Sequence, residues 1–298
     1  MKRHTLITGA SGFLGKYITK VQLNESTSIG RSVTNDILCD LVKDIPSIPE
    51  DINFVVHAAG LAHVSVNSYS DKVLFYNANV LATQNLIQGL SKSKCEIKQF
   101  VYISSVAVYG VDEGVMIDEK FPTIPSTTYG LTKLIAEWLL KDWARENGVE
   151  LIILRLPLLA GESPPGNLGR LINSIGKGLY LSVGSAIEKR SIVLASDVAK
   201  LVSCEDLKAG TYNLTDGYHP SRGELEDEIS KRYEKKIKFT IPLFLAFFLG
   251  KVGDYLPNNF PFKFSDYRKL TSSLTFDDRK ACRQLGWKPR RVLDDPLW

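Results

Sequence analysis

The chain of 298 residues is poor in cysteine and histidine and has no strong excess of either charge. Its four cysteines, Cys39, Cys95, Cys204 and Cys282, lie far apart, with no pair at the spacing of a zinc site or a redox motif. A disulfide framework and a metal site are therefore not expected, and a reducing cytoplasm is the default environment.

Long apolar runs are also missing. The most apolar stretch, residues 241–249, is far shorter than the about 20 residues with which a helix spans a bilayer. We expect a buried or interfacial helix there, with peripheral membrane contact as the alternative. The net charge of +4 is mild and no block of Lys and Arg marks a nucleic-acid site. With 44% hydrophobic residues, the composition predicts a soluble globular protein without a nucleic-acid partner or a membrane span.

The first half of the chain alternates short apolar runs with longer amphipathic ones. Strands are predicted at residues 5–8, 27–30, 53–57, 99–104 and 151–154, and helices at 13–21, 71–92 and 128–147. Strands that alternate with helices form βαβ units, and right-handed crossovers then give an α/β fold with a Rossmann-type, doubly wound parallel sheet.

After Arg155, proline and glycine punctuate a region that is typical of loops around one helix. Surface helices are predicted at 222–233 and 277–285. We expect a dinucleotide-binding domain of residues 1–160 plus about 190–205. The expected substrate-binding lobe is smaller, comprises residues 161–189 and 206–298, and covers the carboxyl edge of the sheet, where ligands bind in such folds.

A glycine-rich loop follows the first predicted strand and opens a helix. Glycines in the pattern G-x-x-G-x-x-G allow a ligand to approach the backbone, and the helix N-terminus suits a pyrophosphate. Small residues after the third strand would let the same ligand lie close to the chain. The predicted dinucleotide contacts are Gly9, Ser11, Gly12, Phe13, Leu14, Gly15, Ala58, Ala59 and Gly60. His57 is expected to be a packed side chain, and His63 is a weaker candidate for the cleft.

The end of the second strand should select the cofactor. An acidic residue there would bind the ribose 2′-hydroxyl of NAD, whereas an arginine accommodates the 2′-phosphate of NADP. The sequence offers Arg31 and no carboxylate in that place, which favours NADP over NAD. Stacking of Arg31 on the adenine of either cofactor is the alternative. Asp40 and Leu41 are expected near the adenine, although a solvated loop carboxylate would explain Asp40 equally well.

Tyr129 and Lys133 lie four residues apart in a predicted helix, so they share one face. A phenol ordinarily titrates near pH 10, and a neighbouring ammonium lowers that pKa, which suits tyrosine to acid–base catalysis at neutral pH. Ser105 ends the fourth predicted strand. A serine there, beside a Tyr/Lys helix and after a dinucleotide loop, completes a hydride-transfer site.

The order of these motifs resembles the extended short-chain dehydrogenase/reductases, and most closely their nucleotide-sugar epimerase/dehydratase branch. The motifs are T-G-A-S-G-F-L-G at 8–15, H-A-A-G at 57–60, S-S-V-A-V-Y-G at 104–110, Y-G-L-T-K at 129–133 and R-L-P at 155–157. The resemblance covers nearly the whole chain.

The resemblance implies a role for each matching position. Tyr129 would be the acid–base group, Lys133 its activator, and Ser105 the donor to the reacting sugar oxygen. The implied cofactor contacts include Tyr129 and Lys133 themselves together with Asn79, Ser104, Pro157 and Leu158. The implied contacts with the substrate diphosphate are Asn167 and Arg190, with Arg170 as a possible helper. Arginine presents a planar fork of donors that matches phosphate oxygens.

The two residues after the catalytic serine narrow the choice of reaction. Family members that dehydrate the sugar resemble one another in carrying Asp-Glu there, whereas this chain has Val106-Ala107, which cannot transfer protons. A 4-epimerase and a 4-ketoreductase of surface-polysaccharide sugar biosynthesis both remain open, and Arg31 leans towards NADPH and reduction. The alternatives are an extended reductase for a non-nucleotide carbonyl compound and a non-catalytic NADP-sensing protein.

The resemblance also implies a homodimer. The helix of Tyr129 presents Leu134, Ile135, Trp138 and Leu139 at helical spacing. Part of this stripe must face the sheet, and part would join the preceding long helix in a four-helix dimer interface. A stripe packed entirely in the core would look the same in sequence.

Overall fold

The computed structural model describes residues 3–21, 26–62, 64, 66, 68–256, 262–296 and 298. Seven parallel strands form the central sheet in the order β11-β7-β5-β4-β1-β2-β3. These strands are β1 (Thr5–Thr8), β2 (Ser26–Gly30), β3 (Ile37–Leu38), β4 (Phe54–His57), β5 (Gln99–Ser105), β7 (Glu150–Leu156) and β11 (Gly210–Asn213). The predicted Rossmann-type sheet is therefore confirmed. Its strand order reverses between β1 and β4, and the crevice at that point is the usual ligand site.

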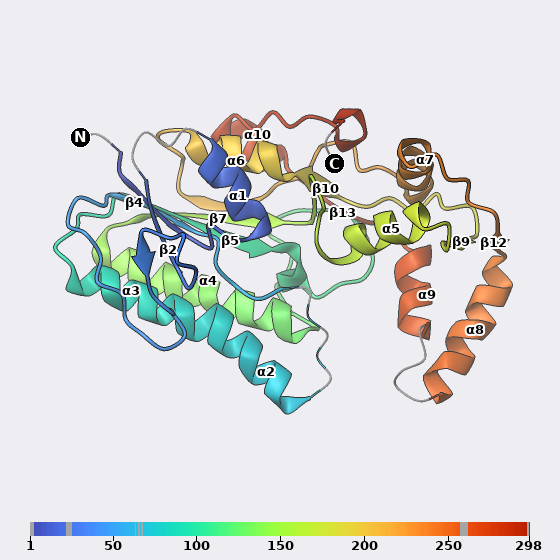
Figure 1. Ribbon diagram of the computed structural model, residues 1–298, viewed down its shortest axis with the longest axis horizontal. Helices are drawn as coiled ribbons and strands as arrows, with labels where there is room; N and C mark the ends of the chain where they lie inside the picture. The colour runs from blue at the N-terminus through green and yellow to red at the C-terminus, as the bar shows by residue number, and fades with distance from the viewer. Residues whose placement is uncertain are drawn as a thin grey trace.

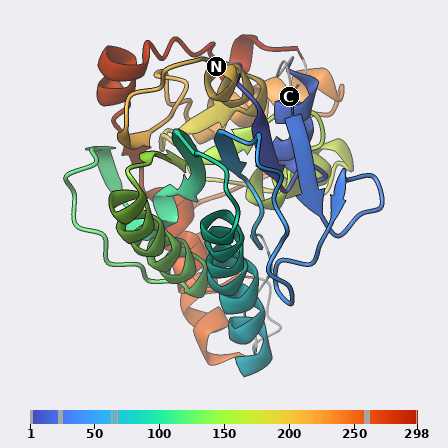
Figure 2. The ribbon, with the colours of Figure 1, turned by 90° about the vertical axis from the view of Figure 1, so that its left-hand side faces the viewer.

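Helices cover both faces of the sheet, as Figures 1 and 2 show. On one side lie α1 (Phe13–Lys20) and α6 (Ala195–Ser203), and on the other lie α3 (Ala82–Lys92) and α4 (Thr128–Asn147). Consecutive strand residues point to opposite faces, so Ile7 packs in the cluster beneath α1 and Leu6 in the cluster beneath α3 and α4. Burial on both faces explains why the central strands are continuous apolar runs.

The helix predicted over residues 71–92 is interrupted. It consists of α2 (Tyr69–Tyr76), a π-helical turn η1 (Asn77–Leu81) and α3. Ser68 and Asp71 form a capping box that starts α2 two residues earlier than predicted. The π turn inserts an extra residue into the helix, a feature that periodicity does not reveal. It carries Asn79, which is buried below the crevice.

The boundary predicted at residue 206 needs a correction for one strand. β11 pairs with β7 as the last strand of the central sheet, so this segment belongs to the sheet and not to the lobe. The strand has only four residues, and its Tyr212 and Asn213 are fully buried. A run this short has no measurable period, so only its tertiary pairing defines it.

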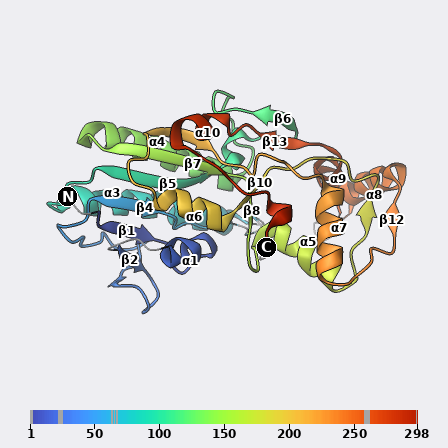
Figure 3. The ribbon, with the colours of Figure 1, turned by 90° about the horizontal axis from the view of Figure 1, so that it is seen from above.

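Apart from α10 (Arg279–Leu285), which packs against β11, the remaining segments pack beyond the carboxyl ends of β5 and β7 (Figure 3). β8 (Leu158–Ala160) pairs with β10 (Ile192–Leu194), and β6 (Gly114–Ile117) pairs with β13 (Leu274–Phe276). A third apolar cluster joins α5 (Gly166–Gly176) to α7 (Arg222–Arg232) and η3 (Val292–Asp294). The other elements are η2 (Val106–Tyr109), β9 (Ser182–Val183) and β12 (Thr240–Ile241).

The helices α8 (Leu243–Tyr255) and α9 (Phe264–Thr271) project from the end of the molecule remote from the N-terminus, as Figure 1 shows. We use the term C-terminal lobe for α5, β9, α7, β12, α8 and α9. The apolar stretch at 241–249 was expected to be buried or interfacial, and the buried alternative is wrong, because most of its large side chains are exposed. Among the described residues, none of the helices has the length and apolar character needed to cross a bilayer.

Candidate active site

The glycine loop brings the start of α1 against the end of β4. Gly9 has φ +74°, and a Cβ there would lie 2.6 Å from the backbone nitrogen of Ala59. A Cβ at Gly15 would lie 2.0 Å from the carbonyl oxygen of Gly9, so both positions require glycine. Gly12 caps α1 without a side-chain hydrogen bond, and the first turn has no acidic residue. The uncapped backbone amides and the open cradle fit a pyrophosphate.

The members of this loop differ in what they offer a ligand. Ser11 is exposed, whereas the side chain of Leu14 is in the core, which leaves its backbone facing the loop. Phe13 packs edge-on against Tyr17 with ring centroids 5.5 Å apart. A Cβ at Gly161 would lie 3.1 Å from the Phe13 ring, so this ring fixes α1 to the segment after β8.

A directed chain of hydrogen bonds runs beneath the crevice through His57. The Ala59 N–H donates to the Thr8 hydroxyl (3.1 Å), which lies 2.6 Å from Nδ1 of His57. Nε2 of His57 lies 2.9 Å from the Thr83 hydroxyl, which itself donates to the carbonyl oxygen of Asn79 (2.7 Å). These donors leave one arrangement, in which neutral His57 carries its proton on Nε2. Burial and the charge of Lys133 lower the pKa of His57 to about 3.

His57 is therefore the packed side chain that the sequence predicted, not a catalytic base. Its ring stacks on Tyr102 with centroids 5.5 Å apart. His63 lies outside the described residues.

Asn79 holds the loop after β4 in place. Its side-chain oxygen accepts from the Leu61 N–H (2.8 Å), and its Nδ2 donates to the Leu61 carbonyl (3.1 Å) and to the Thr132 hydroxyl (3.0 Å). A Cβ at Gly60 would lie 2.6 Å from Oδ1 of Asn79 and 3.2 Å from Nζ of Lys133. Gly60 thus leaves open the space beside the lysine, where a nicotinamide ribose would lie.

The three predicted catalytic residues meet at this crevice. Thr127 caps α4 through the Gly130 N–H, which fixes the first turn with Tyr129, and Lys133 follows one turn later. Desolvation raises the pKa of Tyr129, and its hydrogen bond with Ser105 opposes that shift. Nζ of Lys133 donates to the Ile103 carbonyl (2.9 Å), and burial lowers the pKa of this ammonium to about 8.

A buried ion pair that the sequence did not single out supports this lysine. Glu137, one turn beyond Lys133, is 0% exposed and accepts two hydrogen bonds from Arg155 at 3.0 and 2.7 Å. Its charge opposes the fall in the pKa of Lys133. The Ser104 hydroxyl donates to Glu137 (2.6 Å), so a cofactor would meet Ser104 mainly through its backbone. The Tyr-x-x-x-Lys-x-x-x-Glu spacing points to Glu137 on the same helix face, but nothing in it points to Arg155.

The residues predicted to select the cofactor lie just after β2 and β3. Arg31 is exposed directly after β2. The next carboxylate along the chain, Asp36, accepts two hydrogen bonds from Ser28 through one oxygen, both at 2.7 Å. Asp40 accepts from the Val42 N–H (3.2 Å). Leu41 is buried, with its carbonyl held by Asn85.

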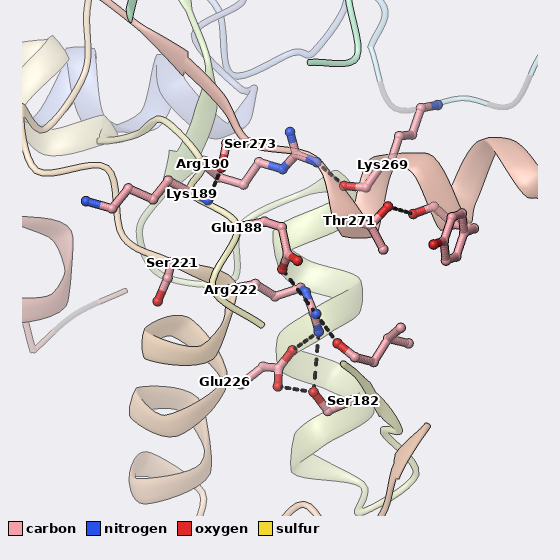
Figure 4. A network of polar contacts seen from close by, with 12 residues as sticks. Ser182, Glu188, Lys189, Arg190, Ser221, Arg222, Glu226, Lys269, Thr271 and Ser273 are labelled. Carbon is pink, nitrogen blue, oxygen red and sulfur yellow. Dashed lines mark hydrogen bonds and ion pairs between the residues drawn. The ribbon is translucent and has the colours of Figure 1, made fainter. Parts of the chain in front are cut away.

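The residues predicted to contact the sugar diphosphate lie around α5 and β10. Pro157 and Leu158 form the junction of β7 with β8, and Asn167 and Arg170 are exposed on the first two turns of α5. Arg190 precedes β10 and is partly buried, and its guanidinium donates to the carbonyl oxygen of Lys269 at the end of α9 (Figure 4).

Arg190 also has a charged neighbourhood. Burial lowers its pKa, while Asp112 and Glu188 oppose the shift. The guanidinium of the neighbouring Arg222 already donates hydrogen bonds to Glu226 (2.6 Å), to the Val183 carbonyl and to the Ser182 hydroxyl (Figure 4). Arg190 is therefore the arginine of this pair with bonding capacity to spare for an anion.

This arrangement can move a proton and a hydride at one carbon. The site holds a phenol that is hydrogen-bonded to a serine hydroxyl, and an ammonium next to the backbone of Gly60. The two residues after Ser105 are Val106 and Ala107 at the start of η2, so no carboxylate follows the serine. The backbone here packs tightly on α4, because a Cβ at Gly130 would lie 2.3 Å from the Ala107 carbonyl oxygen. Proton relays for water elimination are thus absent from this described segment.

Three comparisons with known proteins agree with this geometry. Residues 5–205 match the family described as NAD dependent epimerase/dehydratase. The chain is 29% identical to UDP-glucose 4-epimerase of Vibrio cholerae over 99% of this chain and 93% of that protein. It is 26% identical to N-acetyl-alpha-D-glucosaminyl-diphospho-ditrans,octacis-undecaprenol 4-epimerase of Escherichia coli O157:H7 over 86% of this chain and 79% of that protein.

The fold is similar to solved members as well. UDP-glucuronic acid 4-epimerase from Bacillus cereus in complex with NAD superposes with a TM-score of 0.74 at 19% identity, covering 98% of this chain and 95% of that one. The match over two thirds of the chain, together with the Ser-Tyr-Lys crevice, shows that this protein is a member of the NAD dependent epimerase/dehydratase family.

Proposed function

We propose that the protein is an NAD(P)-dependent enzyme that inverts or reduces carbon 4 of a sugar diphosphate, with 4-epimerisation as its main activity. The observation that carries this proposal is the crevice with Ser105, Tyr129 and Lys133 and with no carboxylate at 106–107. Relatives named as 4-epimerases along most of the chain support it.

Each side chain of the site has a separate role in the proposed reaction. A nicotinamide cofactor held beside Gly60 and Lys133 would supply the hydride chemistry. Tyr129 takes the proton from the 4-hydroxyl and later gives it back, while Ser105 hydrogen-bonds the same oxygen.

Burial raises the pKa of Tyr129, contrary to the sequence expectation, and the hydrogen bond with Ser105 opposes that rise. We propose that the ammonium of Lys133 favours the phenolate once substrate and cofactor are bound, because an adjacent positive charge lowers the pKa of a phenol. Arg190 and Asn167 would hold the diphosphate.

A 4-ketoreductase is the second candidate, and Arg31 is the observation that favours it. An exposed arginine after β2 suits the 2′-phosphate of NADP, and NADPH is the usual hydride source for reductions. Surface-polysaccharide sugar biosynthesis is the setting that we propose for either activity.

In the 4-epimerase proposal, the group attached to the sugar diphosphate is a nucleoside. The Escherichia coli relative is named for a substrate whose diphosphate is linked to undecaprenol, so a polyprenyl carrier is the other possibility. An assay of the activity must therefore include both carriers.

The deciding experiment incubates the purified protein with UDP-hexoses, with 4-keto-6-deoxy UDP-sugars and with a polyprenyl-diphosphate sugar, with and without NADPH, and follows absorbance and product NMR. Interconversion of hexoses without net loss of cofactor would establish the epimerase. Stoichiometric loss of NADPH with the keto sugar would establish the reductase. Turnover only with the polyprenyl-diphosphate sugar would show that the carrier of the sugar diphosphate is a polyprenol and not a nucleoside. No turnover with any substrate would refute the proposal.

A homodimer through α2 and α4 is part of the proposal. Leu74 on α2 is 53% exposed, and Leu131 and Trp138 on α4 are 45% and 52% exposed. Leu134 of the same stripe is buried against the core. Trp138→Glu should place a charge in that interface and shift the mass in light scattering from dimer to monomer, whereas Glu146→Lys, at an exposed position near the end of the same helix, should not.

A further inference from the structure

Helix α8 buries its small residues and exposes its large apolar ones, the reverse of an ordinary amphipathic helix. Its buried residues are the small ones, Ala246, Gly250 and Gly253. Its large apolar residues face outward, including Phe244 at 68% exposed, Phe248 at 62% and Val252 at 53%. Phe244, Phe248 and Val252 follow one another at intervals of four, so they form one stripe along the helix. Burial in the fold therefore does not explain why these residues are apolar.

The small residues let α9 pack closely against α8. A Cβ at Gly250 would lie 3.1 Å from Cα of Phe264. Phe247 meets the rings of Phe264 and Tyr267 edge-on at 5.5 and 5.7 Å. The Phe264 N–H donates to Asp254 (3.1 Å). The two helices thus form a fixed platform, and the outward stripe is presented on a firm backbone.

Positive charge is concentrated in the chain segment that contains this platform. Residues 231–270 contain nine of the 37 Lys and Arg residues but only three of the 33 acidic ones. This segment therefore carries a net charge of +6, whereas the rest of the chain is slightly acidic. Lys235, Lys236 and Lys238 are exposed just before α8, and Lys251 lies on it with Nζ 4.1 Å from the centroid of the Phe264 ring.

The platform is also connected with the candidate active site. Arg190, the proposed diphosphate ligand, donates to the backbone carbonyl of Lys269 at the end of α9 (Figure 4). The outward stripe and the diphosphate end of the crevice are thus joined through one helix.

We propose that the outer surface of α8, with the lysines around it, docks on an anionic lipid bilayer. Apolar side chains flanked by lysines insert at the boundary of headgroups and acyl chains, and the lysines are attracted to acidic lipids. With 13 residues, α8 is about 20 Å long, less than the about 30 Å of a bilayer core, so it lies in the interface. A second copy paired face to face would bring two segments of charge +6 together, which disfavours self-association through this surface.

This inference goes beyond the proposed function, since it holds whichever sugar is converted. The test sediments the full-length protein with vesicles of phosphatidylcholine alone and with vesicles that also contain phosphatidylglycerol. We expect binding to the anionic vesicles and an about tenfold or greater loss for Phe244→Ser/Phe248→Ser and for Lys235→Glu/Lys236→Glu. The matched control is Val115→Ser/Ile124→Ser, which removes two residues that are 74% and 73% exposed on a different surface and should bind like the wild type.

Circular dichroism and melting of each variant show whether it is folded. Binding that is absent in the wild type, equal for neutral and anionic vesicles, or unaffected by the Phe and Lys substitutions would overturn the proposal. A wild-type mass that falls on Phe244→Ser/Phe248→Ser, without vesicle binding, would identify a second copy as the occupant and would also overturn it. Turnover of the sugar substrate is measured separately, so failure of the proposed chemistry leaves this result interpretable.

Discussion

Replacing Glu137 by glutamine should destabilise the protein and shift its pH profile at the same time. The carboxylate is 0% exposed, and Arg155, which it pairs through two hydrogen bonds, is 4% exposed. Glutamine can still accept one of these hydrogen bonds, but the arginine charge then remains buried without a counter-charge. Breaking a buried pair from one side costs about 3–5 kcal/mol. For a chain of this size, that cost corresponds to a fall in melting temperature of about 5–8 °C.

The pH effect follows from the position of Lys133. Burial lowers the pKa of this lysine to about 8, and Glu137 opposes that shift. Without the negative charge, the pKa of Lys133 should fall further, so the ammonium that supports Tyr129 is lost at lower pH. The alkaline limb of kcat/KM should therefore move towards neutral pH.

Thermal melts and pH–rate profiles of three variants test this reasoning. Glu146→Gln removes an exposed carboxylate from the same helix and should leave both measurements unchanged. Glu137→Gln/Arg155→Met should lose less stability than the sum of its single variants, because the double variant leaves no unpaired charge. If Glu137→Gln melted like Glu146→Gln and kept the wild-type alkaline limb, the assignment of a buried ion pair beneath Lys133 would be refuted.

Three further predictions concern single residues. Tyr129→Phe should lower kcat by about 10²–10⁴-fold with cofactor affinity retained, because the ring keeps its packing but loses its proton; turnover near that of the wild type would exclude Tyr129 as the acid–base group. Arg31→Glu should reduce the NADP-to-NAD preference in kcat/KM by about 10–100-fold through loss of a charged hydrogen bond, and an unchanged ratio would assign Arg31 to the adenine instead. His57 has its pKa lowered to about 3, so only the unfolded chain takes up a proton as the pH falls from about 6.5 towards 3, and stability should fall by at most about 1.4 kcal/mol per pH unit. Urea melts at several pH values should show a shallower dependence for His57→Gln, and equal slopes would contradict this account.

The parts of the site that the sequence predicts are local in the chain. The glycine loop depends on the sharp turn at Gly9, and Tyr129 and Lys133 share a helix face through their spacing alone. Glu137 and Arg155 become partners only when α4 lies across β7, so no short motif announces the pair. The π turn around Asn79 escaped prediction for a related reason, because a single inserted residue does not disturb the apolar pattern of a long helix.

The secondary structure of the second half of the chain is harder to predict from the sequence, for a physical reason. Its strands have two to four residues each, and their partners come from distant segments, such as β13 with β6. Hydrophobic periodicity needs a longer window. The outward-facing residues of α8 show the opposite difficulty, since their composition is apolar and a sequence pattern alone favours burial for them.

The way the chain passes between the sheet and the region beyond it has a consequence for substrate entry. The chain leaves the sheet after β7 and returns through β10 into α6 with no intervening residue. It leaves again after β11 and comes back to lay α10 against the sheet. Hinge closure needs a few connections that can absorb large backbone rotations, and here several must bend together. The crevice should therefore keep nearly the same width with and without its ligands, so that association depends on side-chain adjustment and diffusion, with no slow closing step.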